Sequence, residues 1–286
     1  MREIIVGKSI GFCFGVKRAI KMAEKILEEK KVLYSLGDIV HNPIVMEDLI
    51  SKGLKVIRSI NILGNRPFII RSHGLPSSLK EKIRKKTQYI YDATCPHVER
   101  VQKLVKNFSD EGYFIIIVGD KNHPEVKGLK DFAEKSKVVG KDNNFYFKRN
   151  LKKVAIVGQT TLSFNEYFER VKMILDRLQA YEVKILNTLC KITQERQREA
   201  EELSRKADAF LVLGGKNSSN TRRLYNIGKK ENKNTFHIER LDELEKIRFE
   251  KFEKIGIISG TSTPEKFIED VIEYLAKKGY KRRCSK

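Results

Sequence analysis

Residues 95–125 read CPHVERVQKLVKNFSDEGYFIIIVGDKNHPE, and the fold prediction depends on this stretch. A cysteine is followed by an amphipathic segment over Pro96–Ser109, an apolar run over Tyr113–Val118, a Gly-Asp turn and His123. The change from helical to continuous apolar patterning predicts a helix that leads into a buried strand.

The same pattern occurs twice more in the chain. The further copies are Cys13 with a predicted helix Phe14–Glu29, strand Val32–Leu36 and His41, and Cys190 with helix Ile192–Lys206, strand Ala209–Leu213 and Ser218. In all three copies the polar residue lies 28 positions after the cysteine, from 13 to 41, 95 to 123 and 190 to 218. We infer three copies of one α/β unit, each of which contributes a thiol and a polar turn to a shared centre.

Three further apolar runs, Pro67–Arg71, Val154–Val157 and Ile255–Ile258, each precede a polar turn. Continuous apolar strands that alternate with amphipathic helices indicate parallel sheets covered by helices on both faces. The predicted fold is therefore α/β, with three related lobes around a pseudo-threefold centre. We expect lobes at 1–95, 96–190 and 191–286, with residues 1–12 packing against the third lobe.

Helix starts are marked by capping residues. Asn42-Pro43 and Thr263-Pro264 each offer a cap followed by proline at the first helical position. Ser163-Phe164-Asn165-Glu166 matches a capping box.

Composition limits the class of protein. The 286 residues carry a formal net charge of +21 and four cysteines, and no apolar run approaches the roughly 18 residues of a membrane span. The N-terminus lacks a signal peptide, so we expect a cytoplasmic protein without disulfides. Because lysines are spread along the chain, often beside glutamates on predicted helix faces, we interpret the charge as a solvated surface that attracts an anionic substrate or an acidic electron carrier. The sequence lacks a basic–aromatic cluster, so it does not favour nucleic-acid binding.

Thiols at matching positions predict a metal centre. Cys13, Cys95 and Cys190 could hold an iron–sulfur cluster in which one iron has no protein ligand. They could also hold a zinc ion with one open coordination position. The spacing of the cysteines in the sequence does not distinguish these two kinds of metal site. Cys284 lies in the basic tail, and we interpret it as structural or idle.

Polar residues at the predicted strand ends favour an anion site. His41, His73 and His123 follow strands, and Ser218 and Ser262 lie in polar turns just before predicted helices. His97 and His237 are interpreted as structural.

Glu125 is the best candidate acid, with a first-turn helix glutamate as the alternative interpretation. Thr160 and Thr161 could position a hydroxyl group or relay a proton.

Together these segments resemble the 4-hydroxy-3-methylbut-2-enyl diphosphate reductase family. The matching segments are GFCFGVKRA (11–19), GDIVHNPIV (37–45), RSHGLP (71–76), DATCPHVERV (92–101), HPEVKG (123–128), GQTTLS (158–163), GGKNSSNTRRL (214–224) and SGTSTPE (259–265). They run in order through nearly the whole chain, so the resemblance is more specific than any single motif.

The resemblance implies an oxidoreductase of the non-mevalonate isoprenoid pathway, with three α/β lobes around a central [4Fe–4S] cluster that is held by the three cysteines. It implies that the allylic diphosphate is bound by His41, His73, His123, Ser218, Ser219, Asn220 and Ser262. Glu125 would supply protons with help from Thr160, and a ferredoxin or flavodoxin would supply electrons.

The sequence departs from the family pattern in two places. After Cys190 it has Lys191-Ile192-Thr193, where the family often has acid, alanine and threonine, and Gln102 stands where a histidine is common. Two other functions remain alternatives, a zinc-dependent phosphate-ester enzyme and a basic RNA-binding protein.

Overall fold

The computed structural model describes residues 2–142, 145–147 and 151–283. It forms two compact units, one from Met1–Val16, Val40–Asp48 and Lys191–Lys286, and one from Lys17–Ile39 and Leu49–Cys190. Within the described residues, no helix has both the length and the apolar character needed to cross a membrane.

The first unit contains a five-stranded parallel sheet in the order β11-β10-β12-β1-β13. Its strands are β1 (Glu3–Val6), β10 (Ala209–Leu213), β11 (Thr235–Ile238), β12 (Lys254–Ser259) and β13 (Lys281–Arg282). Its helices are α7 (Lys191–Lys206), α8 (Ser219–Glu231) and α9 (Glu265–Lys277), with 3-10 turns at Leu241–Lys246 and Phe249–Lys251.

The second unit contains two four-stranded parallel sheets, β3-β2-β4-β5 and β7-β6-β8-β9. The first is built from β2 (Leu33–Leu36), β3 (Leu54–Ile57), β4 (Phe68–Ile70) and β5 (Ile90–Asp92), with α3 (Ser77–Arg84) and a 3-10 turn at Ile60–Ile62. The second is built from β6 (Phe114–Val118), β7 (Ser136–Val139), β8 (Leu151–Gly158) and β9 (Ala180–Ile185), with α4 (Pro96–Asp110), α5 (Pro124–Asp131) and α6 (Phe164–Leu175). Helices α1 (Phe14–Lys30) and α2 (Pro43–Ser51) each contain a boundary between the two units.

Strand order shows that one topology is used three times. The orders β3-β2-β4, β7-β6-β8 and β11-β10-β12 are the same, and a fourth strand then pairs beside β4, β8 and β12. In the last sheet this fourth strand is β1, whose Ile4 is paired with Ile255 of β12. The three-lobed parallel α/β fold is therefore confirmed, and residues 3–6 complete the third sheet. The lobe boundaries at 95/96 and 190/191 stay a prediction.

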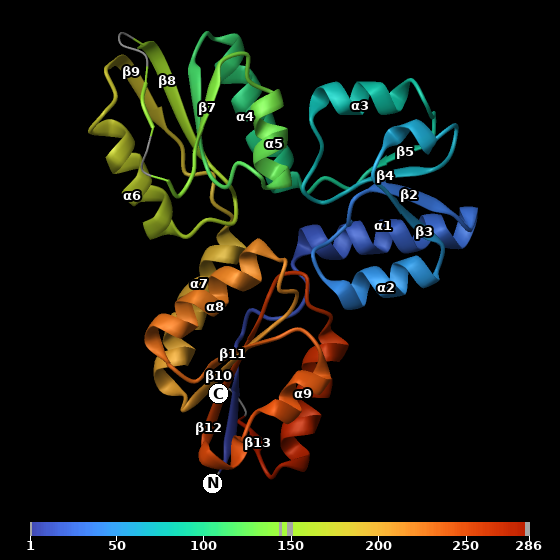
Figure 1. Cartoon of the computed structure of the whole chain (residues 1–286), viewed down its shortest axis with the longest axis vertical. Coiled ribbons are helices and arrows are strands. Elements are labelled where there is room, and N and C mark those ends of the chain that lie inside the picture. The colour runs from blue at the N-terminus through green and yellow to red at the C-terminus, as the bar shows by residue number, and fades with distance from the viewer. Residues whose placement is uncertain (1, 143–144, 148–150, 284–286) are drawn as a thin grey trace. The chain divides into compact units, whose positions relative to one another are not determined.

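Both faces of these sheets are covered by helices (Figure 1). In β6, Ile116 and Val118 pack with α6 on one face, whereas Ile115 and Ile117 pack with α4 and α5 on the other. Since successive strand side chains point to opposite faces, a run of apolar residues is required here.

Two of the three helix caps are confirmed. The Asn42 side chain accepts a hydrogen bond from the Val45 amide, and Ser163 accepts one from Glu166. The third is wrong, because α9 begins at Glu265 and the Thr263 hydroxyl donates to the Leu213 carbonyl at 3.0 Å instead. The partner of this hydroxyl, Leu213 at the end of β10, lies 50 positions away, so the local sequence pattern could not reveal it.

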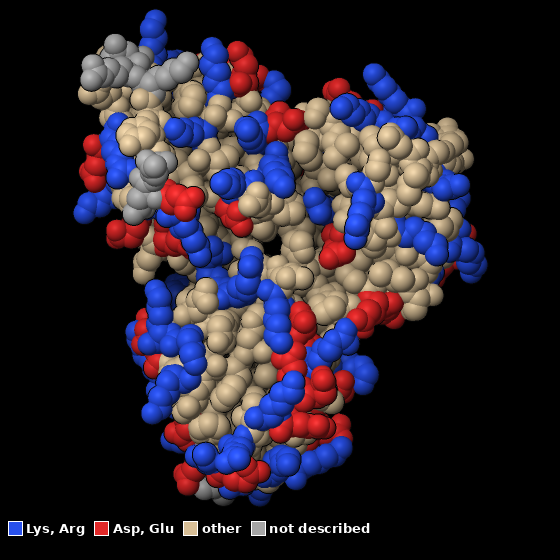
Figure 2. Space-filling model, in the orientation of Figure 1, with Lys and Arg blue, Asp and Glu red and all other residues tan. Residues whose placement is uncertain are grey.

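Basic side chains are spread over the visible surface, with acidic side chains among them (Figure 2). Several form pairs one helical turn apart, such as Lys103 with Glu99 and Lys277 with Glu273, both at 2.8 Å. This distribution agrees with a solvated surface, where such pairs contribute about 0.3–0.5 kcal/mol each.

Replacing Gly228 of α8 by alanine tests the packing of the third sheet. Helix propensity alone favours alanine by about 1 kcal/mol, but a Cβ at this position would lie 2.5 Å from the buried ring of Phe210. We expect overpacking to dominate, with a net destabilisation of about 1–3 kcal/mol and a lower thermal unfolding midpoint. Gly140→Ala is the control, since its Cβ would meet only the Gly119 carbonyl at 3.7 Å; a midpoint for Gly228→Ala at or above that of the control contradicts the packing argument.

Candidate active site

The three cysteines occupy equivalent positions. Each follows the fourth strand of a sheet (β1, β5 and β9) and directly precedes a helix (α1, α4 and α7). The amide of each cysteine donates to a carbonyl in the loop after the third strand of its own sheet: Cys13 to Thr261 at 3.0 Å, Cys95 to Ser72 at 2.9 Å and Cys190 to Thr160 at 2.8 Å. All three cysteines are half-buried. The repetition seen in the sequence is thus a repetition of backbone geometry, while Cys284 lies outside the described residues.

Glu125 lies in the first turn of α5, and its side chain is only 1% exposed. Its Oε1 accepts the Thr160 amide at 2.7 Å, and its Oε2 is 2.8 Å from the Thr160 hydroxyl. A buried carboxyl group requires such partners, because burial without hydrogen bonds costs several kcal/mol. Thr160 also accepts the Cys190 amide, so one residue connects the candidate acid to a candidate ligand loop.

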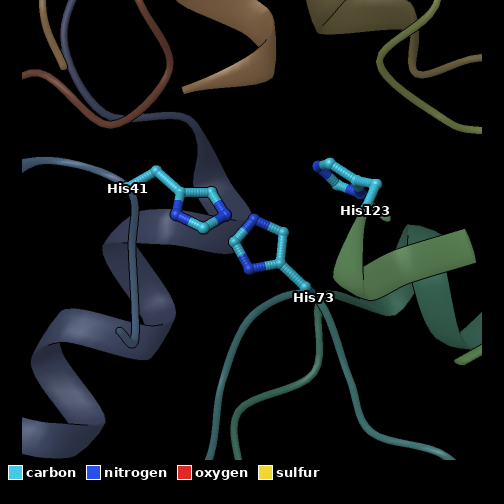
Figure 3. Close-up of side chains that lie close together, drawn as sticks. All are labelled: His41, His73 and His123. Atoms are coloured by element: carbon cyan, nitrogen blue, oxygen red, sulfur yellow. The ribbon is translucent and has the colours of Figure 1, made fainter. Parts of the chain in front are cut away.

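His123 is the N-cap of α5, and its Nδ1 accepts the Glu125 amide at 3.3 Å. Because a backbone amide can only donate, Nδ1 carries no proton and a neutral ring carries its proton on Nε2. The ring of His73 meets that of His123 edge-on, with centroids 5.6 Å apart (Figure 3). The loop after β4 and the start of α5 therefore bring together two of the three predicted histidines within the second unit.

The third histidine, His41, belongs to the first unit together with the predicted serines and Asn220. Its backbone carbonyl accepts the Ser262 hydroxyl at 3.2 Å and lies so close to Gly215 that a Cβ there would approach it to 2.4 Å. Only glycine fits at 215, which explains the glycine that opens this polar loop.

Helix α8 presents the remaining predicted polar residues. Ser218 caps the helix by accepting the Thr221 amide at 3.3 Å, and Ser219 is the first helical residue. Asn220 is 3% exposed, and its amide nitrogen and oxygen make no hydrogen bond within the described part of the chain. Because buried polar groups are nearly always paired, an unpaired amide at a helix start fits a site for a polar ligand.

Sequence reasoning missed Asp92, which lies three residues before Cys95. Its carboxylate accepts the Thr94 amide at 2.9 Å and pairs with Lys80 at 2.9 Å. Burial disfavours the charge, but the hydrogen bonds from Thr94 and the ammonium of Lys80 outweigh it, so the pKa of Asp92 lies below its usual range. The Asp-Ala-Thr spacing, typical of an Asx turn, was the available signal.

The two histidines interpreted as structural each lie beside a backbone carbonyl, whereas Gln102 is buried by packing. The Nε2 atoms of His97 and His237 lie 3.1 Å and 3.0 Å from the carbonyls of Thr188 and Gly214. Gln102 is buried in α4, and its amide packs where a side chain on Gly74 would be.

Comparison with known proteins gives a consistent result over the whole chain. The family model described as LytB protein matches residues 4–276. The chain is 41% identical to a 4-hydroxy-3-methylbut-2-enyl diphosphate reductase of Dictyoglomus thermophilum, covering 95% of each chain. It is 44% identical to one of Caldanaerobacter subterraneus subsp. tengcongensis, covering 95% of this chain and 96% of the relative.

Solved structures agree. A structure described as (E)-4-hydroxy-3-methyl-but-2-enyl diphosphate reductase, the terminal enzyme of the non-mevalonate pathway, is 38% identical with a TM-score of 0.69, covering 97% of this chain and 100% of that chain. The E-1-hydroxy-2-methyl-but-2-enyl-4-diphosphate reductase of Plasmodium falciparum is 27% identical with a TM-score of 0.89, covering 100% and 93%.

Thr160→Val tests the support of the buried carboxyl group. The variant keeps the backbone bond to Glu125 but removes the hydroxyl that contacts Oε2. We expect a loss of about 1–3 kcal/mol of unfolding free energy, measured by chemical denaturation, because one carboxyl oxygen loses its partner. Thr160→Ser keeps the hydroxyl and should stay near wild type; equal losses in both variants would show that the methyl group matters instead.

Proposed function

The chain belongs to the LytB family, and from this membership we propose that it catalyses the reductive removal of the hydroxyl group of (E)-4-hydroxy-3-methylbut-2-enyl diphosphate. The carbon–oxygen bond breaks with uptake of two electrons and two protons, water leaves, and isopentenyl and dimethylallyl diphosphates form. The chain is thus an oxidoreductase of isoprenoid synthesis, and a solved relative is described as the terminal enzyme of the non-mevalonate pathway.

The observation that carries this proposal is the threefold repetition of a cysteine at a strand–helix junction, each with the same backbone hydrogen bond. Three thiolates fit the donor set of a [4Fe–4S] cluster, and Cys13, Cys95 and Cys190 would hold it. When bound, such a cluster supplies electrons and one iron that has no protein ligand.

The diphosphate would be bound by the polar residues that were predicted at the strand ends. The neutral His123 ring offers an Nε2–H donor, as derived from its bond to Glu125. The Asn220 amide, which has no hydrogen-bond partner in the part of the chain that the structure describes, offers a further donor. We assign the diphosphate to these two residues together with His41, His73, Ser218, Ser219 and Ser262.

Glu125 would hold and deliver a proton at the substrate. Its carboxyl group is buried and already positioned by two bonds to Thr160, which reduces the reorganisation needed for proton transfer. Thr160 would orient the substrate hydroxyl through its side chain.

Electrons would come from a ferredoxin or flavodoxin in the cytoplasm. Such carriers are acidic, and a chain with a net charge of +21 attracts an acidic partner at long range.

Anaerobic purification followed by visible spectroscopy and iron–sulfide analysis tests the cofactor. We expect a brown protein with about four irons and four sulfides that reduces the diphosphate with a chemical electron donor, and we expect cysteine-to-serine variants at 13, 95 and 190 to lose both properties. Full iron content and turnover in any one variant would remove that residue from the ligand set. A colourless protein that binds zinc would favour the phosphate-ester enzyme, and salt-sensitive RNA binding without metal would favour the RNA-binding protein.

Glu125→Gln tests the proton donor separately. The amide has nearly the same shape as the carboxyl group but cannot supply a proton, so we expect cluster content to stay near wild type while kcat falls by about 10²–10⁴-fold. Glu99→Gln is a matched control, because Glu99 also lies in the first turn of a helix that begins with a proline, but it is exposed and pairs with Lys103 at 2.8 Å. Turnover by Glu125→Gln at the level of this control would exclude the assignment.

A further inference from the structure

Each of the three helices that follow a cysteine carries a side chain that bonds to the backbone just before another cysteine. These side chains are Arg18 on α1, His97 on α4 and Arg196 on α7, and we refer to them as the loop-anchoring side chains. None of them was singled out as a site residue by its sequence pattern.

Arg18 anchors the loop before Cys95. Its Nη1 donates to the Thr94 carbonyl at 3.0 Å, and its Nη2 donates to the Asp92 carbonyl at 3.1 Å. The planar guanidinium thus holds two carbonyls at once, which a lysine cannot do in the same geometry.

His97 anchors the loop before Cys190. Its Nε2 lies 3.1 Å from the Thr188 carbonyl, and since a carbonyl only accepts, Nε2 is the donor. The Thr188 hydroxyl also bonds to the backbone of Gly158, at 2.7 Å to the carbonyl and 2.8 Å to the amide. The position two residues before Cys190 is therefore fixed from both the helix and the neighbouring strand.

Arg196 anchors the loop before Cys13. Its Nη2 donates to the Gly11 carbonyl at 2.7 Å and its Nη1 to the Ser259 carbonyl at 2.8 Å, while the Ser259 hydroxyl accepts the Gly11 amide at 2.8 Å. Arg196 is only 2% exposed, and Gly11 has a φ of 75°, a conformation that few side chains tolerate. An arginine buried to this degree requires the two carbonyls as partners.

The three contacts follow one cyclic order. The helix after Cys13 anchors the loop of Cys95, the helix after Cys95 anchors the loop of Cys190, and the helix after Cys190 anchors the loop of Cys13. We propose that Arg18, His97 and Arg196 are positioning residues that hold the three ligand loops in the geometry required to retain one metal cofactor. This inference rests on the proposed role of the cysteines as ligands.

The physical reason is that a metal–ligand bond is most stable when the loop that carries the ligand is already held in the binding geometry. Groups that orient metal ligands from outside the coordination sphere typically change metal affinity by about 10- to 100-fold when they are removed.

The test is the rate at which a chelator removes iron from the purified holoprotein, followed by its visible absorbance. We expect Arg18→Gln, His97→Leu and Arg196→Gln each to release iron about 10- to 100-fold faster than wild type. Conservative variants should restore retention in part: His97→Gln keeps a donor to the Thr188 carbonyl, and Arg18→Lys keeps one of two bonds. The thermal unfolding midpoint of each variant is measured as well. If these residues only stabilised the fold, iron retention would follow the unfolding midpoint and would not be restored by a conservative variant whose midpoint is unchanged.

Two controls have the same kinds of bond away from any cysteine. Arg66 donates to the Ile62 carbonyl at 3.2 Å, and the His237 Nε2 lies 3.0 Å from the Gly214 carbonyl. Arg66→Gln and His237→Leu should release iron at the wild-type rate, and equally fast release from these controls would overturn the proposal. Wild-type retention in all three anchoring variants would also overturn it.

The outcomes separate the two proposals. If the wild-type protein binds zinc in place of the cluster, the proposed reductase function is wrong. The positioning role is then tested by the rate of zinc release from the same variants. If Arg196→Gln does not fold, Arg18 and His97, which are both only half-buried, decide the result. A wild-type protein that takes up neither metal overturns both proposals.

Discussion

The hydrogen bond between each cysteine amide and the loop after the neighbouring strand is the interaction on which the candidate site depends. It joins the start of a helix to the carboxyl end of a parallel sheet, where the polar loops gather. Because strand order is the same in all three sheets, this bond recurs three times with lengths of 2.8–3.0 Å. Each candidate ligand is therefore positioned by the sheet that it follows.

Thr160 connects this arrangement to the proposed proton chemistry. Its carbonyl accepts the Cys190 amide, while its own amide and hydroxyl contact Glu125. The equivalent carbonyls of Ser72 and Thr261 accept the other two cysteine amides. One of the three equivalent loops thus also carries the contacts to the candidate acid.

Local patterns predicted the long elements well. The predicted helix over Phe14–Glu29 is observed as Phe14–Lys30, and the predicted strand over Ala209–Leu213 is observed with the same bounds. The fourth strand of each sheet, β1, β5 or β9, was not predicted. The strand conformation of these segments comes from pairing with β12, β4 and β8, respectively.

The sequence by itself determined the three repeats, the candidate ligands at their starts, and the apolar strands and amphipathic helices, because these depend on neighbours within a few turns of chain. Only the tertiary structure decided that β1 completes a sheet with β12, that Glu125 meets Thr160 across 35 positions, and that the Asn220 amide is buried with no hydrogen-bond partner among the described residues. Such contacts arise from packing between elements, and the periodicity of a single segment contains no information about which segment will cover it.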